Sequence, residues 1–428
     1  MSSKETRVDL KSSSMMISGI LLSISGIIIM ITREKLVFTL IQLISAFLIV
    51  SSTIELALLV LGRKDHKHIS LSSSMIGIII GLIVLLFTTI PVSIIVILFG
   101  IYGVCNGVAK LITYYLYKKD QIKGRLILLI DSLLFIILSL SIIFSPIHYA
   151  GQLFFLIGLY TLTLGYTYIR DSLSDIVPTS AKTRFKRRIR VNLPIFLVAI
   201  IPYRMLNIIN HYLSDYDDDG KVTEFVESKV DAKPDLEVLI HVTKDGYGTL
   251  GHVDLVIKDQ VISYGNYDTS SFHLFEAIGD GILFTAPKQE YIAFCIEHSK
   301  KTLFSFGLKL DDEQYERVIE KLREIEKRLY RWYTPYELEQ TKTKKYDDYP
   351  SLLVKEANAK LFKFNKSRFK TYFVLSTNCV LLVDSVLGKA GTDLLNINGV
   401  ITPGTYYDYF DREFYKKNSM VISKKIYK

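Results

Sequence analysis

The chain has 428 residues, of which 49% are hydrophobic, and its mean hydropathy is +0.27. This composition is too apolar for a disordered protein or for an ordinary soluble protein of this length. The net charge of +9 does not indicate a nucleic-acid partner, because it belongs to the first half alone. Residues 1–212 carry 21 Lys and Arg against 9 Asp and Glu, whereas residues 213–428 carry 31 against 34. The three cysteines lie too far apart for a disulfide framework or a structural zinc site, and we expect no metal or cofactor.

Six apolar runs in the first 170 residues are typical of membrane-spanning helices. Each run holds roughly the 20 apolar residues that cross ~30 Å of hydrocarbon. The runs are residues 15–32, 36–62, 71–89, 91–116, 126–145 and 148–169. The sequence therefore predicts an all-α polytopic bundle whose main partner is the lipid bilayer.

The distribution of cations predicts the orientation of this bundle. Lys and Arg are concentrated before the first run, after the second and fourth runs, and in residues 170–190. The connections that follow the first, third and fifth runs carry only two cations, Arg33 and Lys35. By the positive-inside rule, the N-terminus is cytoplasmic.

A seventh run, residues 192–209, contains two prolines and Arg204. One interpretation is an amphipathic helix on the inner membrane surface. We favour a seventh crossing, because the basic block Arg184–Arg190 directly before it would be held on the cytoplasmic side. This interpretation places the C-terminal domain outside the cell.

Repeated features within the six runs predict three helical hairpins. Phe99–Gly103 is echoed by Ile157–Tyr160, and Pro91 and Pro146 each mark a turn between two runs. Small residues allow close helix approach, and the candidates are Gly100, Gly103, Gly107, Gly158 and Gly165. This pattern over residues 12–170 resembles the bacterial acid-resistance membrane protein (HdeD-like) family, which implies a plasma-membrane location.

Three charged residues lie inside the runs, namely Glu55, Lys110 and Asp131. An unpaired carboxylate in a membrane costs at least ~2.5–3.5 kcal/mol, which makes each a functional candidate, for example in a proton relay. The alternative is a neutral or paired carboxyl that holds helices in register. We favour this second interpretation.

An acidic stretch, Asp215–Glu224, follows the seventh run. Its oxygens at positions 1, 3 and 5 and its Gly at position 6 match the start of an EF-hand calcium loop. Position 12 is Val226, however, where a bidentate Glu is expected. We therefore favour a solvated acidic linker over a calcium site.

The periodicity after residue 233 predicts an α+β domain with an antiparallel sheet. The expected strands are Leu236–Val242, Gly251–Ile257, Gln260–Gly265, Gly281–Ala286, Tyr291–Ile296 and Thr302–Leu308. Helices are expected from Leu310 to Tyr330 and from Asn378 to about Lys389. The predicted organisation is a cytoplasmic N-terminus (1–14), a six-span domain (15–170), a basic linker (171–191), the seventh run (192–209), an acidic linker (210–234), the α+β domain (235–412) and a tail (413–428).

Two residues in the α+β domain point to chemistry. His252 is expected at the head of a strand after the glycine-containing stretch Asp245–Gly248, and Cys379 at the start of a helix after polar turn residues. A helix N-terminus and a nearby imidazolium both stabilise a thiolate, which is how a cysteine becomes a nucleophile at neutral pH. The first N–H groups of that helix could stabilise an oxyanion.

This arrangement, Gly251-His252 on a strand with Asn378-Cys379 on a downstream helix, resembles the circularly permuted NlpC-type papain-like superfamily. That superfamily includes the lecithin retinol acyltransferase-like proteins, and the resemblance covers residues 235–412. It implies a permuted papain-like fold with Cys379 as nucleophile and His252 as general base. The third, orienting residue would be Ser263, Tyr264 or Asn266, because no His occurs there. Asn378 would cap the helix.

The other cysteines and histidines have simpler interpretations. Cys295, on an expected strand, and Cys105 in the fourth run are interpreted as buried small hydrophobes. His241, His273 and His298 are expected on the surface or in loops.

The sequence thus predicts a membrane-anchored cysteine hydrolase or acyltransferase that acts on an amide or ester, with peptidoglycan or a lipid as the substrate class. The alternative from another class is a non-enzymatic stress or acid-resistance membrane protein whose soluble domain binds a partner or lipid. A third possibility is a calcium-tuned envelope module. The oligomeric state is not predicted.

Overall fold

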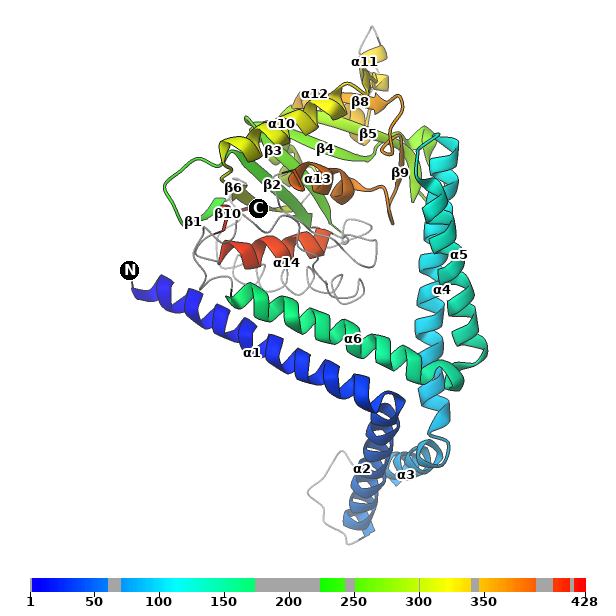
Figure 1. Cartoon of the computed structure of the whole chain (residues 1–428). Helices are drawn as coiled ribbons and strands as arrows, with labels where there is room; N and C mark the ends of the chain where they lie inside the picture. The colour runs from blue at the N-terminus through cyan, green and yellow to red at the C-terminus, as the bar shows by residue number, and fades with distance from the viewer. Residues whose placement is uncertain are drawn as a thin grey trace. The chain divides into compact units, whose positions relative to one another are not determined.

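The computed structural model describes residues 2–60, 71–173, 224–242, 251–299, 301–339, 346–389, 403–415 and 419–428. The chain divides into two compact units. One comprises Ile17–Leu111 and Leu126–Ile169, and the other contains the C-terminal domain. Figure 1 labels most elements of both. The seventh run and residues 215–223 of the acidic stretch Asp215–Glu224 lie outside the described residues.

Six helices occupy the six apolar runs. Their bounds are α1 Ser2–Thr32, α2 Glu34–Val60, α3 Leu71–Leu86, α4 Thr89–Lys119, α5 Arg125–Phe144 and α6 Pro146–Leu173. Four of them, α2, α4, α5 and α6, are long and apolar enough to cross a membrane, and the apolar parts of α1 and α3 are shorter. The helices expose many Ile, Leu and Phe side chains while burying Ser45, Ser52, Ser74, Ser132 and Ser139. Apolar side chains outside and small ones inside suit a lipid environment.

Small residues bring the helices together in pairs. A Cβ added at Gly26 or Gly158 would lie within 2.9 Å of backbone atoms of the facing helix, which joins α1 to α6. Gly81 contacts α2, and Gly107 contacts α5, in the same way. The close pairs are therefore α1 with α6, α2 with α3 and α4 with α5. The hairpins predicted from the turns at Pro91 and Pro146 would instead pair α3 with α4 and α5 with α6. The observed pairs are shifted by one helix, because each helix packs closely where its glycines allow the backbone of the neighbour to approach.

The α4–α5 pair provides a test of this packing. A Cβ at Gly107 would lie 2.6 Å from Ile136 Cγ1 and 3.2 Å from Ser132 O, so Gly107→Leu is expected to force the helices apart at a cost of about 1–3 kcal/mol. The measurement is the thermal stability of the detergent-solubilised full chain. Val108→Leu, on the exposed side of the same turn, is the matched control. Equal stability of the two variants would contradict the packing.

The charged groups inside these helices have partners. Lys110 Nζ lies 2.6 Å from Asp131 Oδ2 and 3.6 Å from the centroid of the Phe135 ring. Ser74 donates a hydrogen bond of 3.3 Å to Glu55 Oε2. These pairs join α4 to α5 and α2 to α3, as the register interpretation predicts.

The C-terminal domain is built on a ten-stranded antiparallel sheet with the order β1-β10-β6-β2-β3-β4-β5-β8-β7, and β9 pairs with β5 off this path. The strands are β1 Glu224–Ser228, β2 Leu236–Val242, β3 His252–Ile257, β4 Gln260–Asn266, β5 Ile278–Pro287, β6 Thr302–Leu308, β7 Leu329–Arg331, β8 Lys360–Phe364, β9 Thr371–Phe373 and β10 Val421–Tyr427. The short helix η2, Thr269–Ser271, lies between β4 and β5. His241 on β2 pairs with His252 on β3.

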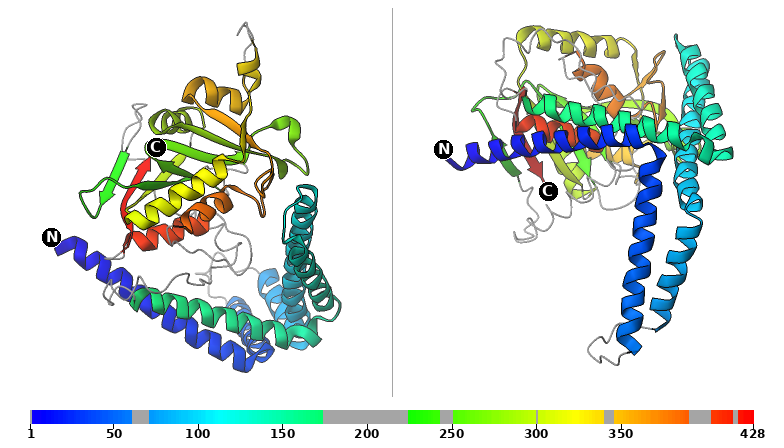
Figure 2. Two further views of the ribbon diagram at one scale, coloured as in Figure 1. Left: turned by 45° about the horizontal axis from the view of Figure 1, so that its top comes forward. Right: turned by 60° about the horizontal axis from the view of Figure 1, so that its bottom comes forward.

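Helices cover both faces of the sheet. The helices of the first face are α10 Asp312–Glu326, α13 Cys379–Leu387 and α14 Pro403–Phe414, and those of the second are α9 Lys288–Glu297 and α12 Tyr349–Ala357. Figure 2 shows α10, α13 and α14 along one side of the sheet. Alternate residues of the strands divide between the two cores. Val253 and Leu255 pack with the first set, whereas Val256 and Val261 pack with the second.

Several predicted boundaries in this domain are wrong. Residues 291–296 form part of helix α9 and not a strand, because Tyr291, Ile292, Phe294 and Cys295 follow a helical spacing and all face the core. The helix expected to reach Tyr330 ends at Glu326, where the chain turns into the edge strand β7. The sheet also extends beyond 235–412, because β1 lies in the predicted acidic linker and β10 in the predicted tail.

Candidate functional site

Cys379 is the first residue of α13, and only 4% of it is exposed. Asn378 caps this helix, because its side chain accepts a hydrogen bond of 3.0 Å from Leu381 N. Asn378 also donates to Val374 O at 3.0 Å, which anchors the turn before the helix. The first N–H groups of a helix have no partner within the helix and carry its positive dipole end. The Cys379 sulfur therefore lies where a thiolate is stabilised.

His252 begins β3, and its imidazole lies near enough to Cys379 for a charge on the cysteine to act on it. The other contacts of the ring are made by Nε2, which lies 2.9 Å from Ser263 Oγ, 2.8 Å from Asp254 Oδ1 and 3.3 Å from Tyr267 Oη. Ser263 Oγ and Tyr267 Oη are themselves 3.0 Å apart. About a fifth (21%) of the His252 side chain is exposed.

The charges around His252 favour an imidazolium. Burial by itself lowers the pKa of His252, but the negative charges of Asp254 and Cys379 outweigh it and raise the pKa to about 10. Burial likewise raises the pKa of Asp254, and the adjacent His252 and His241 reverse this and hold it well below its usual range. Asp254 is fully buried. At neutral pH the site thus contains an ionised Asp254 carboxylate that stabilises a protonated His252 beside the thiol.

His241 and Tyr291 hold the far oxygen of the Asp254 carboxylate. His241 Nε2 lies 2.6 Å from Asp254 Oδ2, and Tyr291 Oη donates to the same oxygen at 2.9 Å. Burial lowers the pKa of His241 to about 4 despite the opposing charge of Asp254. His241 is therefore neutral at neutral pH and donates its Nε2–H to the carboxylate. Its Nδ1 is buried without a hydrogen-bond partner among the described residues.

This neutral histidine predicts a sensitivity to acid. Because the pKa of His241 is about 4 in the folded chain and 6.5 without perturbation, its stabilising contribution is complete above pH 6.5 and is lost as the pH falls towards 4. The free energy of unfolding is expected to fall by up to ~1.4 kcal/mol per pH unit in this window. His241→Gln removes the titrating group and should flatten the dependence.

The fluorescence of Trp332, the single tryptophan, reports unfolding of the C-terminal domain within the full chain. His298→Gln is the control, because His298 is partly exposed and pairs with Glu356. Identical pH dependences of the wild type and His241→Gln would contradict the buried neutral state of His241.

The structure distinguishes among the three candidates for the orienting residue. Ser263 contacts His252. Tyr264 packs in the first core, on the other face of β4 from Ser263, and its hydroxyl donates to Phe369 O at 2.9 Å instead of contacting His252. Asn266 donates to Glu276 O at 3.1 Å, away from His252.

Sequence reasoning missed Asp254 and misplaced His241. His252 and Asp254 are two residues apart on one strand, so their side chains share a face, and this His-x-Asp spacing was a usable signal. His241 was expected on the surface but is buried on β2 directly opposite His252. That position required the register between β2 and β3, and the connecting Asp245–Gly248 stretch lies outside the described residues.

The remaining cysteines lie apart from this site. Cys295 is buried on α9, and burial raises its thiol pKa to about 12. Cys105 is exposed on α4, contrary to the expectation of a buried residue, because the small residues of α4 and not Cys105 face α5.

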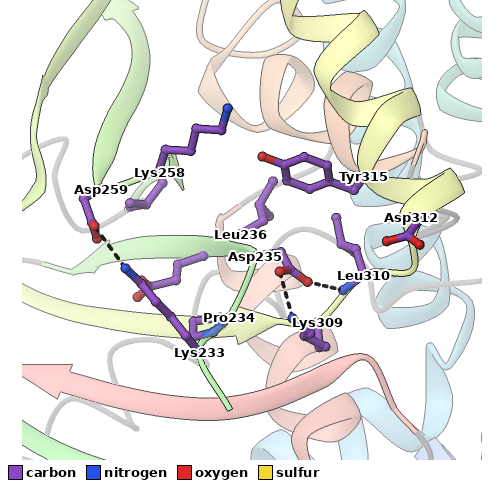
Figure 3. A pocket seen from close by; sticks show the side chains of 12 residues that line it. Lys233, Pro234, Asp235, Leu236, Lys258, Asp259, Lys309, Leu310, Asp312 and Tyr315 are labelled. Atoms are coloured by element: carbon purple, nitrogen blue, oxygen red, sulfur yellow. Dashed lines mark hydrogen bonds and ion pairs between the residues drawn. The ribbon is translucent and has the colours of Figure 1, made fainter.

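A separate cavity of about 480 Å³ lies at the other end of the β2–β3 ladder (Figure 3). Leu236 and Lys258 line it, five or more positions from the His241–His252 pair. Its charges pair with one another, with Lys233 Nζ 3.1 Å from Asp259 Oδ2 and Lys309 Nζ 2.9 Å from Asp235 Oδ1. The described residues that line this cavity include no cysteine, serine or histidine.

Comparison with known proteins identifies one region. Residues 72–144, which cover α3, α4 and α5, match the family described as a short repeat of unknown function, DUF308, an HdeD-related membrane repeat. This agrees with the resemblance in the N-terminal half but covers less of it than residues 12–170. No curated protein and no solved structure matches the chain.

Proposed function

We propose that this chain is a membrane-anchored cysteine hydrolase or acyltransferase that acts on an amide or ester. The observation that carries the proposal is the grouping of three side chains. Cys379 lies at a helix N-terminus, and His252 lies near both Cys379 and Asp254. Ser263 and Tyr267 complete the contacts of His252. This combination supplies a nucleophile, an acid-base group and a group that orients it.

The proposed reaction follows from this arrangement. The Cys379 thiolate attacks the substrate carbonyl carbon and forms a C–S bond, and N–H groups at the start of α13 stabilise the resulting oxyanion. The C–N or C–O bond then breaks as His252 gives its proton to the leaving group. Water or a second acceptor attacks the acyl-enzyme, His252 takes the acceptor's proton, and the C–S bond breaks.

The order of the elements supports a finer assignment to the permuted NlpC-type papain-like superfamily. The histidine strand precedes the cysteine helix in the chain, with α10 between them. The antiparallel sheet places the head of β3 beside the N-terminus of α13. Asp254, on the same strand as the histidine, differs from the family pattern, in which the orienting residue lies on the following strand.

The helical region supports an anchor in the bacterial plasma membrane. We propose that the N-terminus is cytoplasmic and that residues 192–209 cross once more, which places the C-terminal domain outside and makes cell-wall peptide amides its substrate class. Protease added to intact spheroplasts is then expected to digest the C-terminal domain. Complete protection of the domain would contradict both the seventh crossing and the cell-wall substrate.

The test of the site uses an electrophilic, thiol-directed probe on the full chain in detergent. We expect rapid modification at Cys379 at pH 7 and modification slower by on the order of 10²-fold in His252→Ala, which lacks the imidazolium partner. Mass spectrometry of peptides locates the label. Equal labelling rates in the two proteins would contradict the Cys-His pair.

A further inference from the structure

An apolar tip projects from the C-terminal domain beside the segment that leads to Cys379. It consists of Leu274, Phe275 and Leu375, which are 53%, 88% and 45% exposed. Leu274 and Phe275 lie between η2 and β5, and Leu375 lies between β9 and α13. The two loops are joined, because Val374 N donates to Ala277 O at 3.0 Å and Ile278 pairs with Phe373.

The backbone of this tip is strained and firmly held. Leu274, Phe275 and Glu276 have φ values of 51°, 53° and 65°, a left-handed conformation that residues with a Cβ rarely adopt. His273 and Ile278 exchange two backbone hydrogen bonds at the base of the loop, and Asn266 donates to Glu276 O. A strained turn that places a Phe and a Leu in solvent calls for a functional explanation.

The surrounding charge identifies the class of partner. Between Glu356 and Asp384 the chain has five cations and no acidic residue, and this segment includes both Leu375 and Cys379. The cations are Lys360, Lys363, Lys366, Arg368 and Lys370. Lys366 and Lys370 are exposed, and Lys370 Nζ lies 3.9 Å from Asp120 Oδ1. Lys363 is instead held by ion pairs of 2.7 Å with Asp268 and Asp280, so the charge available to a partner belongs to the other cations. Apolar side chains next to cations fit an anionic lipid surface. Glu276 is the acidic residue of the tip itself.

We propose that the apolar tip docks the C-terminal domain on a bilayer containing anionic lipid. The same chain carries helices apolar and long enough to span a membrane, so a bilayer is always present at high effective concentration. A second protein is a poorer fit, because three side chains bury far less than the ~1,200–2,000 Å² of a stable interface. Since Leu375 is four residues before Cys379, docking brings the cysteine helix to the membrane surface.

The experiment uses the full chain reconstituted in phosphatidylglycerol-containing liposomes with brominated acyl chains. Phe275→Trp in a Trp332→Phe background places the single tryptophan at the tip. Val230→Trp in the same background is the control, because Val230 is 54% exposed next to β1, at the opposite edge of the sheet. We expect brominated lipid to quench the tryptophan of the Phe275→Trp variant at least twofold and to shift its emission to shorter wavelength. The tryptophan of the control variant should be unaffected.

Two results would overturn the proposal. In the first, the tip tryptophan remains as accessible to acrylamide as the control tryptophan and is not quenched by brominated lipid. In the second, the tip tryptophan is protected from acrylamide in both liposomes and detergent without lipid quenching, which would indicate a protein partner or a second copy.

Replacing Lys366, Arg368 and Lys370 by Gln is expected to reduce the quenching, and unchanged quenching would overturn the role of anionic lipid. None of these readouts depends on catalysis.

Discussion

Replacing Cys379 with alanine is expected to abolish acyl transfer from an activated ester, by on the order of 10³-fold or more, because no other described thiol has a histidine partner. The measurement is the release of the alcohol from a chromogenic ester, together with the mass of the trapped acyl-enzyme. The wild type should gain one acyl group on Cys379, and Cys379→Ala should gain none.

Cys295→Ala is the matched control for this prediction. Cys295 is as buried as Cys379, but burial raises its pKa to about 12, so it remains a thiol at neutral pH. We expect this variant to retain its acylation rate even if the small cavity costs some stability. An acyl group on Cys295, or full activity in Cys379→Ala, would contradict the assignment of the nucleophile.

Replacing Asp254 with asparagine is expected to have the second largest effect, a loss of about 10²–10⁴-fold in turnover at pH 7. Asn keeps the size of the side chain but removes the charge that, against burial, raises the pKa of His252. The wild-type rate should fall on the alkaline side near pH 10, where His252 loses the proton it gives to the leaving group. In Asp254→Asn this alkaline limb should move to lower pH.

Ser263→Ala separates Asp254 from the residue suggested by the family resemblance. Ser263 is neutral and contributes one hydrogen bond to His252, so its loss should cost less than about tenfold and leave the alkaline limb in place. Trp332 fluorescence and thermal melting verify that each variant is folded. A large loss in Ser263→Ala with an unchanged Asp254→Asn would assign the orienting role to Ser263 instead.

Much of the fold could be predicted because the signals are local. Long apolar runs determine where helices form, and five of the six helices begin and end close to the predicted runs, whereas α1 begins already at Ser2. Five of the six expected strands are present, as is the helix beginning at Asn378-Cys379, because they depend on alternation and capping, which the sequence displays directly. Helix α9 was mistaken for a strand because a run of six residues with two aromatic side chains fits both periodicities. Strands β1, β7, β8, β9 and β10 were missed because pairing with partners distant in the sequence stabilises them.

By itself, the sequence determined that this protein combines an apolar helical region with an α+β domain, and it identified Cys379 and His252 as candidates through their local contexts. Only the tertiary structure decided how they are supported. Asp254, His241 and Tyr291 come from β3, β2 and α9, and they meet because the register of β2 on β3 and the packing of α9 bring them into one buried cluster. Likewise, exposure of Leu274 and Phe275 follows from a strained turn braced by Asn266, which no pattern in the sequence indicates. Local propensity depends on neighbours in the chain, whereas a buried charge network depends on residues brought together by folding.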